Sequence, residues 1–226
     1  MTADRATAND HDAPPGRQLR LAHIPLHPAA ATDPERPDPL LDDADRAALA
    51  RLTPRARGQF TARRIALHRA LGMLLDRPSQ QVRIIHRPGH PPQLPEYPQL
   101  AVSTSATSAL LSVAVSEAWD IGLDIEAVPD ATAARHLLRM TEAHLPFPAR
   151  SLTPREVCRT WTSIEAWSKL TGIHLPGALA LHRAGGLTAL RQARGDTDML
   201  PLRVPAPDHE GTLWHAPRAR AAHPDG

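Results

Sequence analysis

An alternation of apolar and polar residues is the clearest pattern in the chain, and it lies between positions 119 and 126. Ile121, Leu123 and Ile125 recur at every second position, which is the period of a half-buried β-strand. Asp124 and Glu126 therefore emerge together on the opposite face, with Cα atoms roughly 6.5–7 Å apart. Carboxylates this close repel each other unless a cation lies nearby. Mg²⁺ fits such a pair, in particular where phosphates supply its other ligands. The alternative is a solvated strand face without a ligand.

A second pattern, at helical spacing, follows further along the chain. The sequence Thr153–Glu156 is a capping box with proline at the first helical position, and it predicts a helix that ends at Gly172. Trp161, Glu165 and Lys169 share one side of this helix. Lys169 is the only lysine of the chain, which suggests a specific role. Glu165 and Lys169 are also spaced as a surface ion pair, which stabilises a helix by only ~0.3–0.5 kcal/mol.

Shorter apolar runs place the remaining elements. They predict strands at 19–26, 82–85, 100–103 and 110–115, and helices at 43–52, 54–75, 133–139 and 142–145. A short turn at 117–118 should return the chain into 119–126, so that 110–126 forms a β-hairpin. Two or three short strands are expected between 179 and 214. Residues 1–16 read as a poorly ordered tail, and residues 215–226 read as a mobile tail.

Composition limits the classes of function. The 226 residues carry a formal net charge of +2. The single cysteine, Cys158, excludes an intramolecular disulfide and suits a reducing cytosol; inside a helix, a buried structural thiol is expected. No apolar run reaches the ~18 residues of a membrane helix, and the N-terminus has no signal-peptide pattern. A cytoplasmic protein without membrane contact is predicted.

Arginines gather on the predicted helix 54–75, at Arg57, Arg63, Arg64 and Arg69. They make either a solvated basic face or a surface that grips phosphate. Nucleic-acid binding is disfavoured because only one aromatic residue, Phe60, is interleaved with them. The chain also lacks the glycine-rich phosphate loop, the dinucleotide fingerprint, the zinc-protease helix motif and the serine-hydrolase elbow.

Taken together, Ile121–Glu126 and Trp161–Lys169 resemble the two signature motifs of the 4′-phosphopantetheinyl transferases. The closer likeness is to the larger, monomeric type that activates polyketide and nonribosomal peptide synthetases. Supporting features run from about residue 19 to residue 176. They are Leu40-Leu41, the arginine-rich helix 54–75, Gly89-His90-Pro91, Val102-Ser103 and Thr171-Gly172.

The resemblance implies both a fold and a reaction. The fold would be α+β, with two similar halves, 17–118 and 119–214, related by a pseudo-twofold axis. Each half would be a small antiparallel sheet packed on a long helix, with the active site between the halves. The reaction would move the phosphopantetheine arm of coenzyme A onto a serine of an acyl or peptidyl carrier protein. Mg²⁺ would be required, and adenosine 3′,5′-bisphosphate would be released.

The resemblance also implies roles for single residues. Asp124, Glu126 and Glu165 would hold Mg²⁺ against the pyrophosphate, and Glu165 would be the candidate base for the carrier serine. Lys169 would meet the phosphates. The nucleotide end would be held by the other matched residues, which are Gly89, His90, Pro91, Ser103, Thr104 and one of the helix arginines, Arg64 or Arg69.

Three positions depart from the family pattern. The family usually has Ser-His where this chain has Ser103-Thr104, and that histidine contacts a phosphate of coenzyme A. A hydrogen bond to a charged group contributes ~1.5–3 kcal/mol, against ~1 for a neutral one. Ile164 and His90 stand where basic residues are common. The phosphate cradle is therefore thin, which indicates a weaker or specialised enzyme.

Two alternatives from other classes remain open. One is a non-catalytic module that binds coenzyme A or a carrier protein without turnover, for which Thr104 is the discriminating feature. The other is an unrelated Mg²⁺-dependent phosphohydrolase. It would need a water-activating group near Asp124, and none is evident in the sequence.

Overall fold

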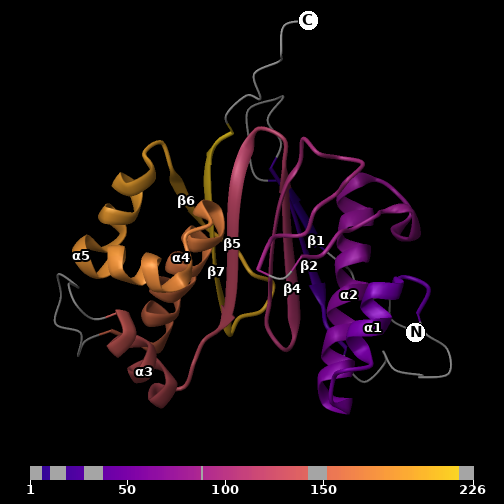
Figure 1. Cartoon of the computed structure of the whole chain (residues 1–226). Coiled ribbons are helices and arrows are strands. Elements are labelled where there is room, and N and C mark those ends of the chain that lie inside the picture. The colour runs from indigo at the N-terminus through magenta and orange to yellow at the C-terminus, as the bar shows by residue number, and fades with distance from the viewer. Residues whose placement is uncertain (1–6, 11–18, 28–37, 88, 142–151, 219–226) are drawn as a thin grey trace, which may run out of the picture.

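The computed structural model describes residues 7–10, 19–27, 38–87, 89–141 and 152–218. Within these ranges the protein has an α+β fold of two antiparallel sheets flanked by helices (Figure 1). The first sheet has the order β1-β2-β4-β3, and the second has the order β5-β7-β6. The α+β class expected from the sequence is confirmed.

The strands and helices have the following bounds. The first sheet contains β1 (Thr7–Asp10), β2 (Leu19–Pro25), β3 (Ala101–Ala106) and β4 (Leu110–Ser116), and the second contains β5 (Trp119–Ala127), β6 (Asp198–Pro201) and β7 (His209–Pro217). The helices are α1 (Asp43–Leu49), α2 (Pro54–Leu75), α3 (Ala131–Thr141), α4 (Pro154–Thr171) and α5 (Leu175–Arg194), with a short 3₁₀ helix, η2 (Ser79–Gln81).

The two sheets stack face to face, and each carries helices on its outer side (Figure 1). One apolar cluster lies between α2 and the first sheet, with Leu71 and Val113 fully buried. A second cluster fills the space between the sheets and includes Leu123 and Ile125 of β5. A third packs α4 and α5 against β7 around Trp167. The inward-facing apolar residues of β5 thus pack against the first sheet, as their alternation requires.

The predicted β-hairpin at 110–126 is wrong. β4 already pairs with β2 along one edge and with β3 along the other, so neither edge is left for β5. The chain therefore leaves the first sheet after Ser116, and β5 pairs along its whole length with β7. This moves the strand of acidic residues into the second sheet, where it faces α4.

Helix ends follow the sequence signals closely. The capping box at Thr153 is present, with Glu156 bonded back to the Thr153 backbone, and Gly172 ends α4 in the left-handed region at φ 71°. Helix α2 has the predicted bounds, and Asp42 caps α1 by accepting the Asp45 N–H at 2.7 Å. Helix α1 stops at Leu49, three residues before its predicted end at Leu52.

Several other expectations need correction. Residues 82–85 form no strand, only an isolated bridge from Ile85 to Gln93. Residues 175–194 form a helix with a kink at Gly185–Gly186, so the strands expected after 179 are confined to β6 and β7. Residues 7–10, expected within a poorly ordered tail, form β1, and β7 extends to Pro217. The helix predicted at 142–145 lies outside the described residues. No helix of the described ranges is long and apolar enough to cross a membrane.

Candidate metal centre and adjoining cavities

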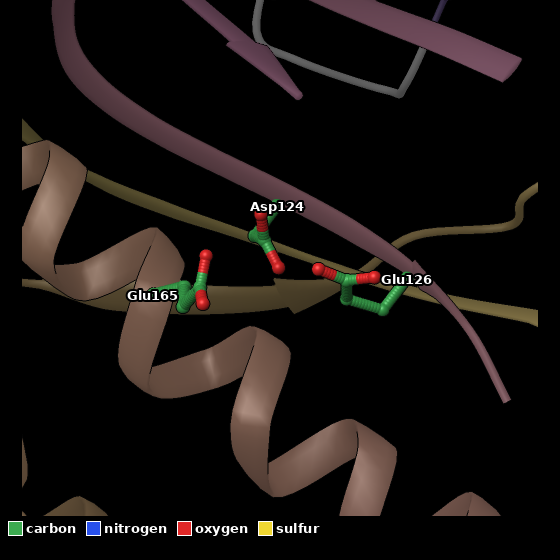
Figure 2. A group of neighbouring side chains, drawn as sticks. All are labelled: Asp124, Glu126 and Glu165. Atoms are coloured by element: carbon green, nitrogen blue, oxygen red, sulfur yellow. The ribbon is translucent and has the colours of Figure 1, made fainter. Parts of the chain in front are cut away.

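Three carboxylates from two elements meet beside the second sheet. Asp124 and Glu126 come from β5 and Glu165 comes from α4, and one oxygen of each lies within 4.8 Å of the others. Figure 2 shows the three side chains pointing toward a common centre between strand and helix. The structure thus brings together the three residues that the sequence assigned to Mg²⁺. The alternative of a solvated strand face is wrong, because Asp124 is only 1 % exposed.

A close approach of α4 to β5 creates this meeting point. A Cβ at Gly122 would lie 1.9 Å from the Ala166 carbonyl oxygen and 2.5 Å from the Leu170 nitrogen. Only glycine, two residues before Asp124, allows the helix backbone this close. Glu165 and Lys169, each one residue before these two contacts, are thereby held over the strand.

The two oxygens of Asp124 have different surroundings. Oδ1 accepts from Lys169 Nζ at 2.7 Å and from Ser105 Oγ at 2.8 Å. Oδ2 is buried and has no hydrogen-bond partner among the described residues. Lys169 also donates to the carbonyls of Leu123, at 3.1 Å, and Thr104, at 3.4 Å. An orphaned buried carboxylate oxygen is costly, and a cation between the three carboxylates would satisfy it.

The electrostatics point the same way. Burial, followed by the charge of Asp124, raises the pKa of Glu165 to about 7. Burial and Asp124 also raise the pKa of Glu126. Burial raises the pKa of Asp124, although Lys169 opposes the shift. One ammonium therefore does not offset three carboxylates, and the group as a whole favours a further positive charge.

A cavity of about 680 Å³ opens over the carboxylates. Its walls come from α2, β3, β5 and α4, and Arg64 is one of the lining side chains. Arg64 lies 2.9 Å from Asp45 of α1 and 4.8 Å from the Phe60 ring, so it is already partnered. Arg69, the other predicted phosphate ligand on α2, is exposed and lines neither cavity described here.

A second cavity, of about 550 Å³, adjoins the first at His90, Pro92, Thr104 and Lys169. The residues predicted to hold the nucleotide end, helix arginines apart, line it together: Gly89, His90, Pro91, Ser103 and Thr104. Ser103 is buried, and its hydroxyl oxygen accepts the Leu123 N–H at 2.9 Å. Its own O–H is still able to donate toward the cavity.

Other polar residues that position the site were not found from the sequence. Glu210 lies opposite Glu126 in the β5–β7 pairing and accepts hydrogen bonds from Arg155 and Arg159, the latter at 2.7 Å. This cluster fastens the first turns of α4 to β7. The sequence does not reveal it, because the arginines and Glu210 are about fifty positions apart and meet only where α4 packs on β7. Ser105 was also missed, and its place on β3 two residues after Ser103 was the available signal.

Cys158 is the structural thiol that the sequence predicted. It is buried between α4 and β5, with its Sγ near the carbonyls of Glu126 and Ala127. Burial and the nearby Glu126 raise the pKa of this thiol to about 12. A thiol with so high a pKa is a poor nucleophile at neutral pH.

Comparisons with known proteins add no family assignment. No protein-family model matches the chain, and no curated protein matches it either. The functional argument therefore rests on the residues and geometry of the site.

Proposed function

We propose that this protein is a Mg²⁺-dependent 4′-phosphopantetheinyl transferase that modifies a serine of an acyl or peptidyl carrier protein. The observation that carries the proposal is the meeting of Asp124, Glu126 and Glu165 around a buried, unpartnered Oδ2. Lys169 stands beside this group, and two cavities open from it. The two sequence motifs of the resemblance supply all four residues.

The donor set fits Mg²⁺. The three carboxylates are hard oxygen ligands, and the open cavity leaves room for water and phosphate oxygens, which this ion retains in most protein sites. When bound, the ion would neutralise charge that develops on the pyrophosphate during transfer. Asp124 would present Oδ2, and Glu126 and Glu165 would present one oxygen each.

Glu165 is the proposed proton acceptor. The carrier serine oxygen forms a bond to the phosphorus next to the pantetheine arm, while the bond from that phosphorus to the adenosine bisphosphate oxygen breaks. The serine proton passes to Glu165, and adenosine 3′,5′-bisphosphate leaves. A bound cation would keep this carboxylate ionised, so that it could accept the proton. The serine must come within ~3 Å of this carboxylate, so the carrier has to dock closely.

Lys169 is the proposed phosphate contact, and the two adjoining cavities are the proposed substrate path. The three Lys169 N–H groups already reach Asp124, Leu123 and Thr104, with the Thr104 contact the longest. Turning that third N–H from Thr104 toward a phosphate would give up the weakest of the three hydrogen bonds. The nucleotide end is assigned to the cavity of Gly89, His90 and Ser103, and the arm to the cavity over the carboxylates.

The finer description of the fold belongs to the same proposal. Residues 17–118 and 119–214 are assigned as two related halves, each with a sheet packed on a long helix, α2 or α4. What supports this is that α2 packs on the first sheet and α4 on the second. A cytoplasmic monomer that contacts neither nucleic acid nor membrane is proposed as the working form.

The proposal is tested by mixing the protein with coenzyme A, Mg²⁺ and a panel of apo carrier proteins. Intact-mass measurement should show the mass of the phosphopantetheine arm added to at least one carrier, and chelation of the metal should prevent it. Asp120→Asn is the control for Asp124→Asn on the same strand. Asp120 is paired with Arg194, away from the three carboxylates. No mass change on any carrier at high coenzyme A would overturn the proposal.

A non-catalytic protein that binds coenzyme A or a carrier is the second candidate. Thr104 favours it, because this residue lines both cavities with a neutral hydroxyl where the resembled family has a histidine. Such a protein would show a thermal shift with coenzyme A and Mg²⁺ but no carrier modification. The same panel therefore separates the two candidates.

A further inference from the structure

Ser105 lies at the seam between the two sheets, that is, the line where β3 contacts β5. Neither sequence motif includes this residue. β3 and β5 lie side by side but belong to different sheets, so no ladder of backbone hydrogen bonds joins them. Side chains of β3 cross the seam instead. Ser103 accepts the Leu123 N–H at 2.9 Å, and Ser105 donates to Asp124 Oδ1 at 2.8 Å. Ser103 and Ser105 are two apart on one strand and therefore face the same side.

The side-chain hydrogen bonds to the Asp124 carboxylate all end on one of its two oxygens. Both donors, Ser105 and Lys169, reach Oδ1, and neither reaches Oδ2. Two donors at one oxygen fix the plane of a carboxylate that would otherwise rotate about its last torsion. Figure 2 shows one oxygen of Asp124 directed between the carboxylates of Glu126 and Glu165. The arrangement holds Asp124 ready to present one oxygen to a cation.

The two donors are not equivalent. Lys169 shares its ammonium among three acceptors, and its side chain is 34 % exposed at the junction of the two cavities. A substrate phosphate would be a further acceptor for the same ammonium. Ser105 donates from a strand, and its only other acceptor among the described residues is the Ile125 carbonyl at 3.5 Å. Ser105 is therefore the donor to Oδ1 with the fewest competing acceptors.

We propose that Ser105 is a positioning residue that holds the Asp124 carboxylate with Oδ2 free for the cation. The inference rests on the metal site of the proposed function and adds a residue of β3, outside the two motifs, to its support. Hydrogen bonds that orient metal ligands change metal affinity about 10- to 100-fold when they are removed. A loss of that size is expected here.

The test measures Mn²⁺ binding to the protein without coenzyme A. Titration calorimetry and the electron spin resonance of free Mn²⁺ are the two readouts. Ser105→Ala should weaken Mn²⁺ binding about ten-fold or more. Ser105→Thr, which keeps the hydroxyl, should bind Mn²⁺ with an affinity close to that of the wild type. Ser105→Cys keeps a similar volume but donates weakly, so it should resemble the alanine variant. Ser116→Ala is the matched control, because it removes a buried hydroxyl that accepts the Trp119 N–H. It should bind Mn²⁺ as the wild type does.

The outcomes separate this inference from the proposed function. Wild-type affinity in both Ser105→Ala and Ser105→Cys would overturn the positioning role while leaving the metal site in place. An equal loss in Ser105→Thr would overturn it too, since the hydroxyl would then not be the cause. If Asp124→Asn binds Mn²⁺ as tightly as the wild type, the metal site itself fails, and the positioning role with it. Carrier modification is not needed for any of these results.

Discussion

At the scale of single residues, the site depends on the charge of Asp124. Asp124→Asn keeps the shape and the bond from Ser105 but removes the charge that a cation would meet at Oδ2. We expect Mn²⁺ binding to become undetectable and transfer to fall by a hundred-fold or more. Thermal unfolding should change little, because the variant also relieves repulsion from Glu126 and Glu165. Undiminished transfer, measured by carrier mass beside the Asp120→Asn control, would refute the assignment.

Glu165 should make the proposed metal binding depend on pH. Its pKa is about 7 in the folded, metal-free protein, against about 4.3 in an unfolded chain. Between these values the folded state holds a proton that the unfolded state has lost, so this group stabilises the fold at low pH and the contribution fades as pH rises through 7. A cation competes with that proton.

The stabilisation by Mg²⁺ should therefore grow between pH 6 and pH 8. Unfolding midpoints measured with and without Mg²⁺ across this range provide the check. Glu165→Gln has no proton to lose and should show a flatter profile; any slope that remains comes from Asp124 and Glu126, whose pKa values are also raised. A wild-type profile as flat as that of the glutamine variant would show that Glu165 does not face the ion.

In the proposed coenzyme A site, Thr104 should set the strength of the phosphate contacts. It lines both cavities beside Lys169, and its neutral hydroxyl gives ~1 kcal/mol where a charged donor gives ~1.5–3. Thr104→His should tighten coenzyme A binding up to about ten-fold, as measured by titration calorimetry. Thr104→Asn, a neutral donor of similar reach, should leave the affinity near that of the wild type. Equal affinity of the histidine variant and the wild type would count against this account of the cradle.

At the scale of elements, the helix ends were predicted well because they depend on residues close in sequence. Thr153, Glu156 and Gly172 set the ends of α4 because caps act within one turn. Pairing was predicted poorly because it depends on distant partners. No sequence signal near β5 indicates that β2 and β3 already occupy both edges of β4. Helix α5 was missed because Gly185 and Gly186 interrupt its pattern with a kink.

Gly122 sets the distance between β5 and α4. A methyl group there would collide with the Ala166 carbonyl and the Leu170 nitrogen, both of them backbone. Gly122→Ala should destabilise the fold by about 3 kcal/mol and separate Glu165 from Asp124. Gly177→Ala is the matched control, because its near neighbour is a side-chain methyl group, Cγ2 of the exposed Ile173, and not backbone. Chemical denaturation gives the stability, and Mn²⁺ binding gives the geometry. Equal stability of the two variants would contradict the close approach.

At the scale of the whole molecule, the site joins the two sheets. Asp124, Glu126, Glu165 and Lys169 were found from the sequence because each pair lies within one element. Ser105 was not found, since its role exists only where β3 meets β5. The same holds for the cavity walls from α2, which reach the carboxylates only after the sheets have stacked. Sequence thus identified the reactive groups, and the fold supplied what orients them.

This placement predicts coupling between metal and coenzyme A. The pyrophosphate would share the cation with β5 and α4 while the nucleotide end contacts β3 and the Gly89–Pro91 turn. Each ligand should therefore raise the affinity for the other. A ligand at a hundred-fold excess over its Kd stabilises by about 2.7 kcal/mol, or about 5–10 °C for a chain of this size. With both ligands present, the rise in unfolding temperature should exceed the sum of the separate rises, as measured by scanning calorimetry. In Asp124→Asn the excess should vanish while coenzyme A alone still stabilises. Simple additivity in the wild type would mean that the two ligands do not share a phosphate, and that the nucleotide lies elsewhere.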